Sequence, residues 1–268
     1  CLLANKLASL DPFGVGIEME ADKPNWFDSL NGLPGLLGSS ICETFELKRL
    51  ILIIKEALDK AATEKLSVTE EIYNFLIELN NLIRDYFDNN PPEKDYLFWD
   101  KSHCLKEEYR HKTKLGFSGN ETPLERAALI DILDNALKKI DSGLSKAKEK
   151  NKDIYCAYFI NEATEFEPLK SPYVRPVKFI QKKLPLFLEG QMHAIRLAKN
   201  TDAARNLYKA TKTSLLYDKK LKMYKVTAPL ASMSEEIGRC RIFSPGWLEN
   251  ESVWLHMEYK YLLELLKH

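Results

Sequence analysis

The chain has 268 residues and equal numbers of basic and acidic residues, 39 of each, so its formal net charge is zero. A chain of this length with 45% hydrophobic residues can bury a full core, as one large domain or two small ones. Without a basic excess to follow a phosphate backbone, nucleic acid is not an expected partner. The longest apolar run near a helix, Leu50 to Ile54, is far too short to span a bilayer. We therefore expect a cytoplasmic protein with no membrane partner.

Apolar residues at helical spacing dominate the chain. They predict helices over residues 45–61, 68–87, 122–143, 188–199, 202–212 and 251–267. In the third helix, Thr122 is the expected N-cap and Pro123 lies in the first turn. Strand signals are short and weak, and the best of them cover residues 154–159 and 224–227. The pattern predicts a mainly α fold of antiparallel helix pairs joined by functional loops, with minor short strands.

The five cysteines are widely scattered, and no two of them form a Cys-x-x-Cys pair. An odd number of distant cysteines is typical of thiols in a reducing compartment, and it argues against a disulfide framework. The spacing also lacks a zinc-binding pattern. We therefore predict no metal site and no resident cofactor.

Both ends of the chain have the composition of structured elements. Leu2 and Leu3 read as the middle of an apolar element, and the strongly helical residues 259–266 stop abruptly. We expect residues 1–268 to form a single mainly helical domain that is part of a larger catalytic domain cut at both ends. A processed mature protein is the alternative.

The segment from Pro24 to Ser40 combines aromatic rings, a carboxylate and turn-forming residues. Trp26 and Phe27 directly precede Asp28, and an amide follows at Asn31. An aromatic platform beside a carboxyl group suits a sugar, because its C–H face stacks on the ring while its hydroxyls take polar partners. A buried turn in which Asp28 caps a helix is the alternative interpretation.

The segment from Phe243 to His256 carries a second group of this kind. A Pro-Gly turn precedes Trp247, and Glu249 and Asn250 follow just before the predicted helix. Glu249 and His256 lie seven positions apart, about two helical turns, so they share a face if the helix begins early. The alternative is a helix capped by Asn250, with His256 as a core histidine.

Together these two segments resemble loops of the cellobiose-phosphorylase-like inverting glycoside phosphorylases. Residues 25–31 are similar to the acid loop Asp-Trp-Asn-Asp-x-x-Asn at the Trp, the second Asp and the final Asn. Residues 245–256 are similar to the loop Pro-Gly-x-x-Glu-Asn-Gly-Gly-x-x-x-His in the same register. The chain departs from these motifs at Asn25, where the family has Asp, and at Glu251 and Ser252, where it has two glycines. No other part of the chain carries the resemblance.

The resemblance implies a fold and a reaction. The fold would be an (α/α) toroid of helical hairpins, present here in part. The reaction would cleave or transfer glycosyl units of an oligosaccharide with inversion, most directly as a glycoside phosphorylase with inorganic phosphate as co-substrate. Two alternatives stay open: an inverting glycoside hydrolase of the glucoamylase-like toroid class, and a non-catalytic carbohydrate-binding or scaffold module.

The residues fit this chemistry in different roles. Asp28 is the candidate general acid, because the rings beside it can desolvate its carboxyl group and keep it protonated. Glu249, the second candidate catalytic residue, is either the base of a hydrolase, about 6.5–9.5 Å from the acid, or a ligand of a sugar hydroxyl. A carboxylate at Glu251 would repel phosphate by about 1 kcal/mol or more where it is poorly screened. The expected substrate-binding residues are Trp26, Asn31, Trp247, Asn250, His256 and Glu20.

Overall fold

The chain forms two compact units, each containing helices and strands. The computed structural model describes residues 1–19, 38–89, 91–148, 153–234 and 237–268. Unit 1 comprises residues 1–17 and 46–143, and unit 2 comprises residues 18–45 and 144–268. The division falls within two long helices, α2 (Ile41–Lys60) and α5 (Arg126–Ala147). The single domain expected for residues 1–268 stays a prediction.

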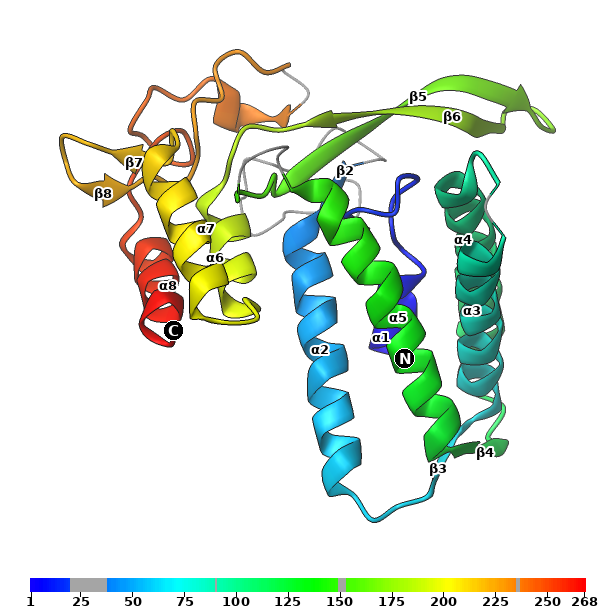
Figure 1. Ribbon diagram of the computed structural model, residues 1–268. Coiled ribbons are helices and arrows are strands. Elements are labelled where there is room, and N and C mark those ends of the chain that lie inside the picture. Colours follow the sequence, from blue (N-terminus) through cyan, green and yellow to red (C-terminus); the bar gives the residue numbers. More distant parts are fainter. Residues whose placement is uncertain (20–37, 90, 149–152, 235–236) are drawn as a thin grey trace. The chain divides into compact units, whose positions relative to one another are not determined.

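Unit 1 is built from helices and one two-stranded antiparallel sheet (Figure 1). Besides most of α2 and α5, its elements are α1 (Leu2–Leu7), β3 (Lys65–Thr69), α3 (Glu70–Asp88), α4 (Lys94–Thr113) and β4 (Glu121–Glu125). Helices α3 and α4 pack side by side, with the ring of Phe75 stacked on that of Tyr109 at 4.9 Å. The predicted apolar face of α3 is buried.

Unit 1 contains a buried lysine. Lys139 of α5 is fully buried, and its Nζ lies 2.9 Å from Asp95 Oδ1 and 3.6 Å from the centre of the Tyr86 ring. The Tyr86 hydroxyl donates to the same carboxylate oxygen at 2.9 Å. Gly14 approaches so closely that a Cβ there would lie 2.6 Å from both charged atoms. Burial, followed by the charge of Asp95, raises the pKa of Tyr86, so its hydroxyl stays a donor.

Among its described residues, unit 2 combines a four-stranded sheet with three complete α-helices, a short 3-10 helix (Arg239–Arg241), the start of α2 and the end of α5 (Figure 1). The strand order is β1-β2-β5-β6, and its strands are β1 (Ile17–Glu18), β2 (Gly38–Ser40), β5 (Tyr158–Pro168) and β6 (Val174–Lys183). The pairs β2·β5 and β5·β6 are antiparallel, and β5 and β6 form a long hairpin. Helix α6 (Leu188–Arg196) packs against both α7 (Thr201–Thr213) and α8 (Leu255–Leu266). Two short strands, β7 (Tyr217–Asp218) and β8 (Met223–Tyr224), form a third sheet.

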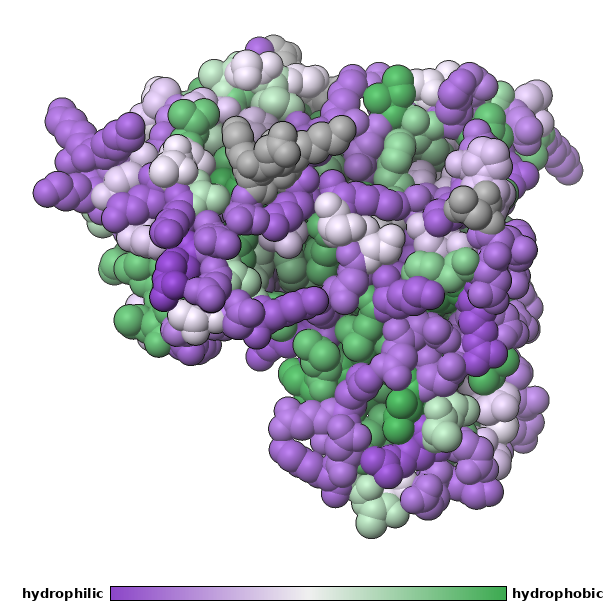
Figure 2. Space-filling model, viewed as in Figure 1, coloured by the Kyte–Doolittle hydropathy of each residue, from purple (hydrophilic) through white to green (hydrophobic). Residues whose placement is uncertain are grey.

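Hydrophilic residues predominate on the face of the molecule that Figure 2 shows. Among the described helices, none combines the length and the apolar composition that a membrane span requires.

The predicted mainly α toroid is wrong, because the chain is a mixed α/β structure with a four-stranded sheet. The hairpin of β5 and β6 accounts for most of the difference. Its outer part is exposed and is stabilised by cross-strand ion pairs, such as those of Glu165 with Lys178 and Glu162 with Lys182. Alternating charged residues of this kind bury little apolar surface, so the hydrophobic pattern that indicates a half-buried strand is absent.

The boundaries of individual elements also differ from the prediction. Thr122 and Pro123 do not begin a helix: they lie in β4, opposite Val68 and Ser67, and α5 starts at Arg126. Proline is tolerated there because a two-stranded sheet consists only of edge strands. Helix α4 was not predicted, since its buried face includes Ser102 beside the aromatic residues and its apolar periodicity is weak.

Removing Asp95 should destabilise unit 1 more than removing Lys139. Asp95→Ala leaves a buried ammonium group without its carboxylate, which costs about 3–5 kcal/mol. Lys139→Met places an apolar side chain among the rings, and Asp95, whose side chain is 24% exposed, regains water more easily. Urea-induced unfolding of both variants, and of the double variant, tests this. The double variant should be more stable than Asp95→Ala alone, and equal costs of the two single changes would contradict the buried charge pair.

Candidate functional site

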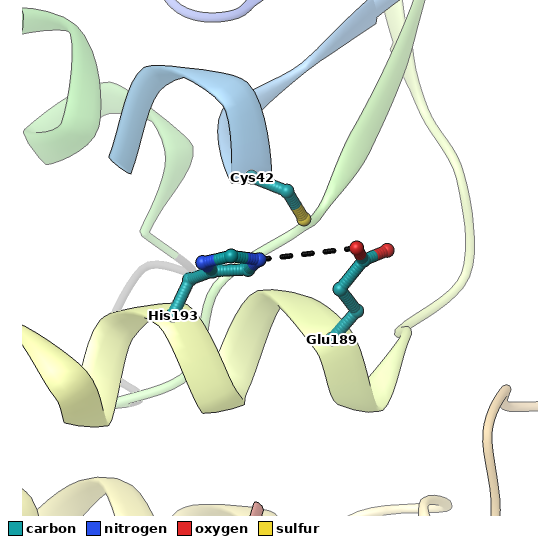
Figure 3. Close-up of side chains that lie close together, drawn as sticks. All are labelled: Cys42, Glu189 and His193. Atoms are coloured by element: carbon teal, nitrogen blue, oxygen red, sulfur yellow. Dashed lines mark ion pairs between the residues drawn. The ribbon is translucent and has the colours of Figure 1, made fainter. Parts of the chain in front are cut away.

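Three side chains with metal-ligating and acid–base chemistry meet in unit 2. Cys42 lies in the first turn of α2, whereas Glu189 and His193 lie four residues apart on α6 and therefore share one face of that helix. Figure 3 shows the Cys42 sulfur directed toward the space between the imidazole and the carboxylate. We call these three residues the Cys–Glu–His cluster. Their ligand atoms all lie within 4.8 Å of one another.

The start of α2 is fixed by hydrogen bonds to the sheet. The backbone N–H of Ile41 donates to the carbonyl of Ala157 at 2.9 Å, where β5 is about to begin. The Ser40 hydroxyl accepts from the backbone N–H of Cys42 at 3.1 Å, as an N-terminal cap does. Cys42 is therefore held in one position at the end of the helix.

Helix α6 is held against the same part of the chain. Gly190 lies so close that a Cβ added there would be 3.0 Å from the Cβ of Ala157. The side chain of Gln191 accepts from the backbone N–H of Tyr155 at 3.1 Å and donates to its carbonyl at 2.7 Å. This contact brings Glu189 and His193 to the start of α2.

The carboxylate of Glu189 has two neighbours with different roles. Tyr158 donates to Glu189 Oε2 at 2.6 Å, while Oε1 faces His193 Nε2 at 3.8 Å. Burial, followed by the negative charge of Glu189, raises the pKa of the Cys42 thiol and also that of the Tyr158 hydroxyl. Cys42 is consequently a protonated thiol at neutral pH and a poor nucleophile as it stands. Its sulfur, the carboxylate and the imidazole are the described groups best placed to hold a metal ion.

Four predicted site residues, Asp28, Trp26, Asn31 and Glu20, lie outside the described residues. The chain on either side of them is described: the backbone N–H of Met19 donates to the carbonyl of Gly38 at 2.9 Å. The two described residues that flank this segment, Met19 and Gly38, therefore lie next to each other in unit 2. From Gly38 the chain reaches Cys42 within four residues.

Glu249 lies before α8 rather than within it, so it does not share a helical face with His256. Its side chain is buried, and among the described residues its Oε2 has no hydrogen-bond partner. His256 is exposed in the first turn of α8, where its ring stacks on Trp254 at 5.5 Å, so it is not a core histidine. Trp247 is 63% exposed.

Asn250 uses its amide inside the loop. Its Oδ1 accepts from the backbone N–H of Leu230 at 3.2 Å, and its Nδ2 donates to the carbonyl of Phe243 at 2.7 Å. The N-cap of α8 is Trp254, so Asn250 does not cap that helix. The amide instead ties the loop to a distant part of unit 2.

Glu251 adopts a backbone conformation that favours glycine. Its φ is +56°, in the left-handed region, and its N–H donates to the Thr227 hydroxyl at 3.0 Å. The carboxylate is paired with Lys225, with 2.7 Å between Nζ and Oε2, and both side chains are largely buried. The charge of Glu251 is therefore compensated by Lys225, which directly follows β8.

The sequence alone did not indicate the Cys–Glu–His cluster. The one local signal was a Glu and a His four residues apart in a predicted helix, a spacing that places both on one face. Nothing in the sequence connects that pair to a cysteine nearly 150 residues earlier.

The left-handed conformation at Glu251 should be measurable in unfolding experiments. Glu251→Ala and Glu251→Gly both remove the ion pair with Lys225, but only glycine relieves the left-handed strain. We expect the glycine variant to be more stable than the alanine variant by about 1 kcal/mol. Gly246→Ala is the matched control, because φ is +87° there and an added Cβ meets nothing within 4 Å. It should be destabilising by a similar amount, and an alanine variant at 251 as stable as the glycine variant would contradict the assigned conformation.

Comparisons with known proteins do not identify a family. The chain matches no protein-family model and no curated protein. The resemblance to phosphorylase loops therefore rests on the residues of those two segments, and the functional conclusion rests on the chemistry of unit 2.

Proposed function

We propose that this chain belongs to a cytoplasmic carbohydrate-active enzyme that cleaves or transfers glycosyl units of an oligosaccharide with inversion. Phosphorolysis is the favoured reaction, with inorganic phosphate as second substrate. The proposal depends on the two loops and their chemistry, and not on a toroidal fold.

One observation supports the loop resemblance independently of residue identity. At the position where the phosphorylase loop has its first glycine, Glu251 has a left-handed backbone, with φ of +56°. Non-glycine residues adopt this conformation in only a few per cent of cases. The backbone of this chain therefore has the shape that a glycine at this position would favour.

The side chain two residues before that position, Glu249, suits a sugar hydroxyl. Glu249 has a buried carboxyl oxygen that lacks a hydrogen-bond partner among the described residues. A buried acceptor left without a donor costs about 1–3 kcal/mol, and a sugar hydroxyl would supply the donor. In this role Glu249 binds substrate, and Asp28 protonates the leaving oxygen as general acid.

The pairing of Glu251 with Lys225 weakens an objection to phosphate. The objection is that a carboxylate at Glu251, where the family has glycine, would repel phosphate if its charge were not compensated. With Lys225 Nζ at 2.7 Å, the pair is close to neutral overall and its field falls off faster than that of a lone charge. A phosphate nucleophile is therefore compatible with this loop.

Hydrolysis is the second candidate, and the same carboxylate favours it. An inverting hydrolase needs a second carboxylate to activate water, and Glu249 is the carboxylate in the matched loop that could act as that base. The two reactions thus differ in what they require of Glu249.

Replacing the general acid should slow the reaction without unfolding the protein. In the full-length protein, Asp28→Asn should lower kcat by about a hundredfold or more on a substrate with a poor leaving group. Asp202→Asn, at a highly exposed position of α7, is the matched control and should leave the rate unchanged. Circular dichroism of both variants checks folding. Near-normal turnover by Asp28→Asn would remove Asp28 from this role.

Phosphate dependence should separate the two reactions. The full-length protein is incubated with a β-linked oligosaccharide, with and without inorganic phosphate, and the products are separated by ion-exchange chromatography. A phosphorylase releases sugar 1-phosphate only when phosphate is present, and Glu249→Gln then mainly raises KM. A hydrolase releases equal amounts of free sugar in both tubes, and Glu249→Gln then lowers kcat by about a hundredfold. Glycan binding without turnover in either tube would refute the enzyme and leave a binding module.

A further inference from the structure

The Cys–Glu–His cluster takes no part in the proposed glycosyl chemistry, yet its composition is that of a metal site. It gathers one sulfur, one carboxylate and one imidazole from α2 and α6, all in unit 2 (Figure 3). Zinc is bound by this set of donors: cysteine sulfur, histidine nitrogen and carboxylate oxygen. Sites with three protein ligands leave a fourth position for water.

We propose that Cys42, Glu189 and His193 bind one zinc ion, with a water molecule as the fourth ligand. This reverses the expectation of no metal site that the scattered cysteines suggested. It is independent of the proposed glycosyl transfer, since none of the three ligands belongs to the loops that carry that proposal.

The distances between the three ligand atoms are close to those of a zinc site, so small side-chain movements would bring them to bonding distance of a cation. With bond lengths of about 2.1 Å, nitrogen and oxygen ligands of a tetrahedral zinc ion lie about 3.4 Å apart. Glu189 Oε1 and His193 Nε2 are 3.8 Å apart and Figure 3 shows them facing each other. The remaining separations are at most 4.8 Å, so Cys42 has to move by no more than about 1 Å to reach the spacing of a tetrahedral site.

Tyr158 orients the carboxylate for this role. It donates to Glu189 Oε2 at 2.6 Å and leaves Oε1 directed toward His193. Hydrogen bonds of this kind to a ligating carboxylate fix its orientation and raise metal affinity. Tyr158 is almost fully buried, so its hydroxyl has little access to competing water.

The charges favour a divalent cation over a reactive thiol. A thiolate at Cys42 beside the Glu189 carboxylate would put two negative charges in a largely buried site, and Zn²⁺ would neutralise both. Cysteine nucleophiles need an electropositive surrounding, whereas Cys42 lies beside a carboxylate. A metal ion removes the proton from a coordinating thiol.

Metal binding by the chelator-treated full chain tests the proposal. Isothermal titration with Zn²⁺ should give one site per chain, and Co²⁺ should give the thiolate-to-metal charge-transfer band of a cysteine ligand. Zinc should also raise the Tm, because a ligand that binds the folded state stabilises it. These readouts do not involve glycan turnover, so failure of this proposal is distinct from failure of the proposed function.

Variants assign the ligands. Cys42→Ala and His193→Ala should each weaken zinc binding at least a hundredfold and abolish the rise in Tm, and Cys42→Ala should abolish the Co²⁺ band. Tyr158→Phe should weaken binding about tenfold and keep the band. The matched controls are Cys156→Ala, buried in the same unit, and Cys104→Ala, an exposed cysteine near His103. Both should bind zinc as the unchanged chain does.

Two results would overturn the assignment. One is the absence of stoichiometric binding at micromolar Zn²⁺ by the unchanged chain. The other is unchanged affinity in Cys42→Ala together with a loss in Cys104→Ala, which would mean an adventitious surface site. Melting curves recorded without metal identify variants that fail to fold. In place of such variants, the zinc affinities of Tyr158→Phe and Glu189→Gln test the ligand assignment.

Discussion

The close contact of helix α6 with the chain just before β5 determines where the polar groups of unit 2 lie. Gly190 lacks the Cβ that would crowd Ala157. The Gln191 amide makes hydrogen bonds to the backbone N–H and carbonyl of Tyr155, as a paired strand would. With α6 fixed there, Glu189 meets the hydroxyl of Tyr158. A larger side chain at 190 would displace the helix, and the carboxylate with it.

Unit 2 thus positions functional groups in two ways. The Cys–Glu–His cluster lies on regular elements, so its geometry follows from helix spacing and from the register of β2 with β5. The loop before α8 instead depends on irregular backbone, with left-handed residues at Leu248 and Glu251 and the amide of Asn250 as a brace. Such a loop stores strain, which native structures retain chiefly at binding and catalytic sites.

The parts of the fold predicted from sequence are those in which apolar spacing sets the structure. Helix α3 buries one continuous apolar face, and α2, α6 and α7 were located for the same reason. The β5–β6 hairpin could not be found this way, because cross-strand ion pairs rather than buried apolar residues hold its outer part together. The Pro-Gly pair in the sequence predicted the loop that holds Glu249. The sequence could not predict the cluster, because Cys42 and α6 are far apart in the sequence and are brought together only by the tertiary structure.

The hydrogen bond between Met19 and Gly38 makes the sheet of unit 2 independent of the length of the segment between these two residues. Because Met19 and Gly38 lie next to each other, the register of β2 with β5 does not depend on how many residues lie between those two positions. Doubling the length of such a connection costs only about 0.6 kcal/mol in loop-closure entropy. The length and composition of residues 20–37 could therefore change while the sheet and the start of α2 stay the same.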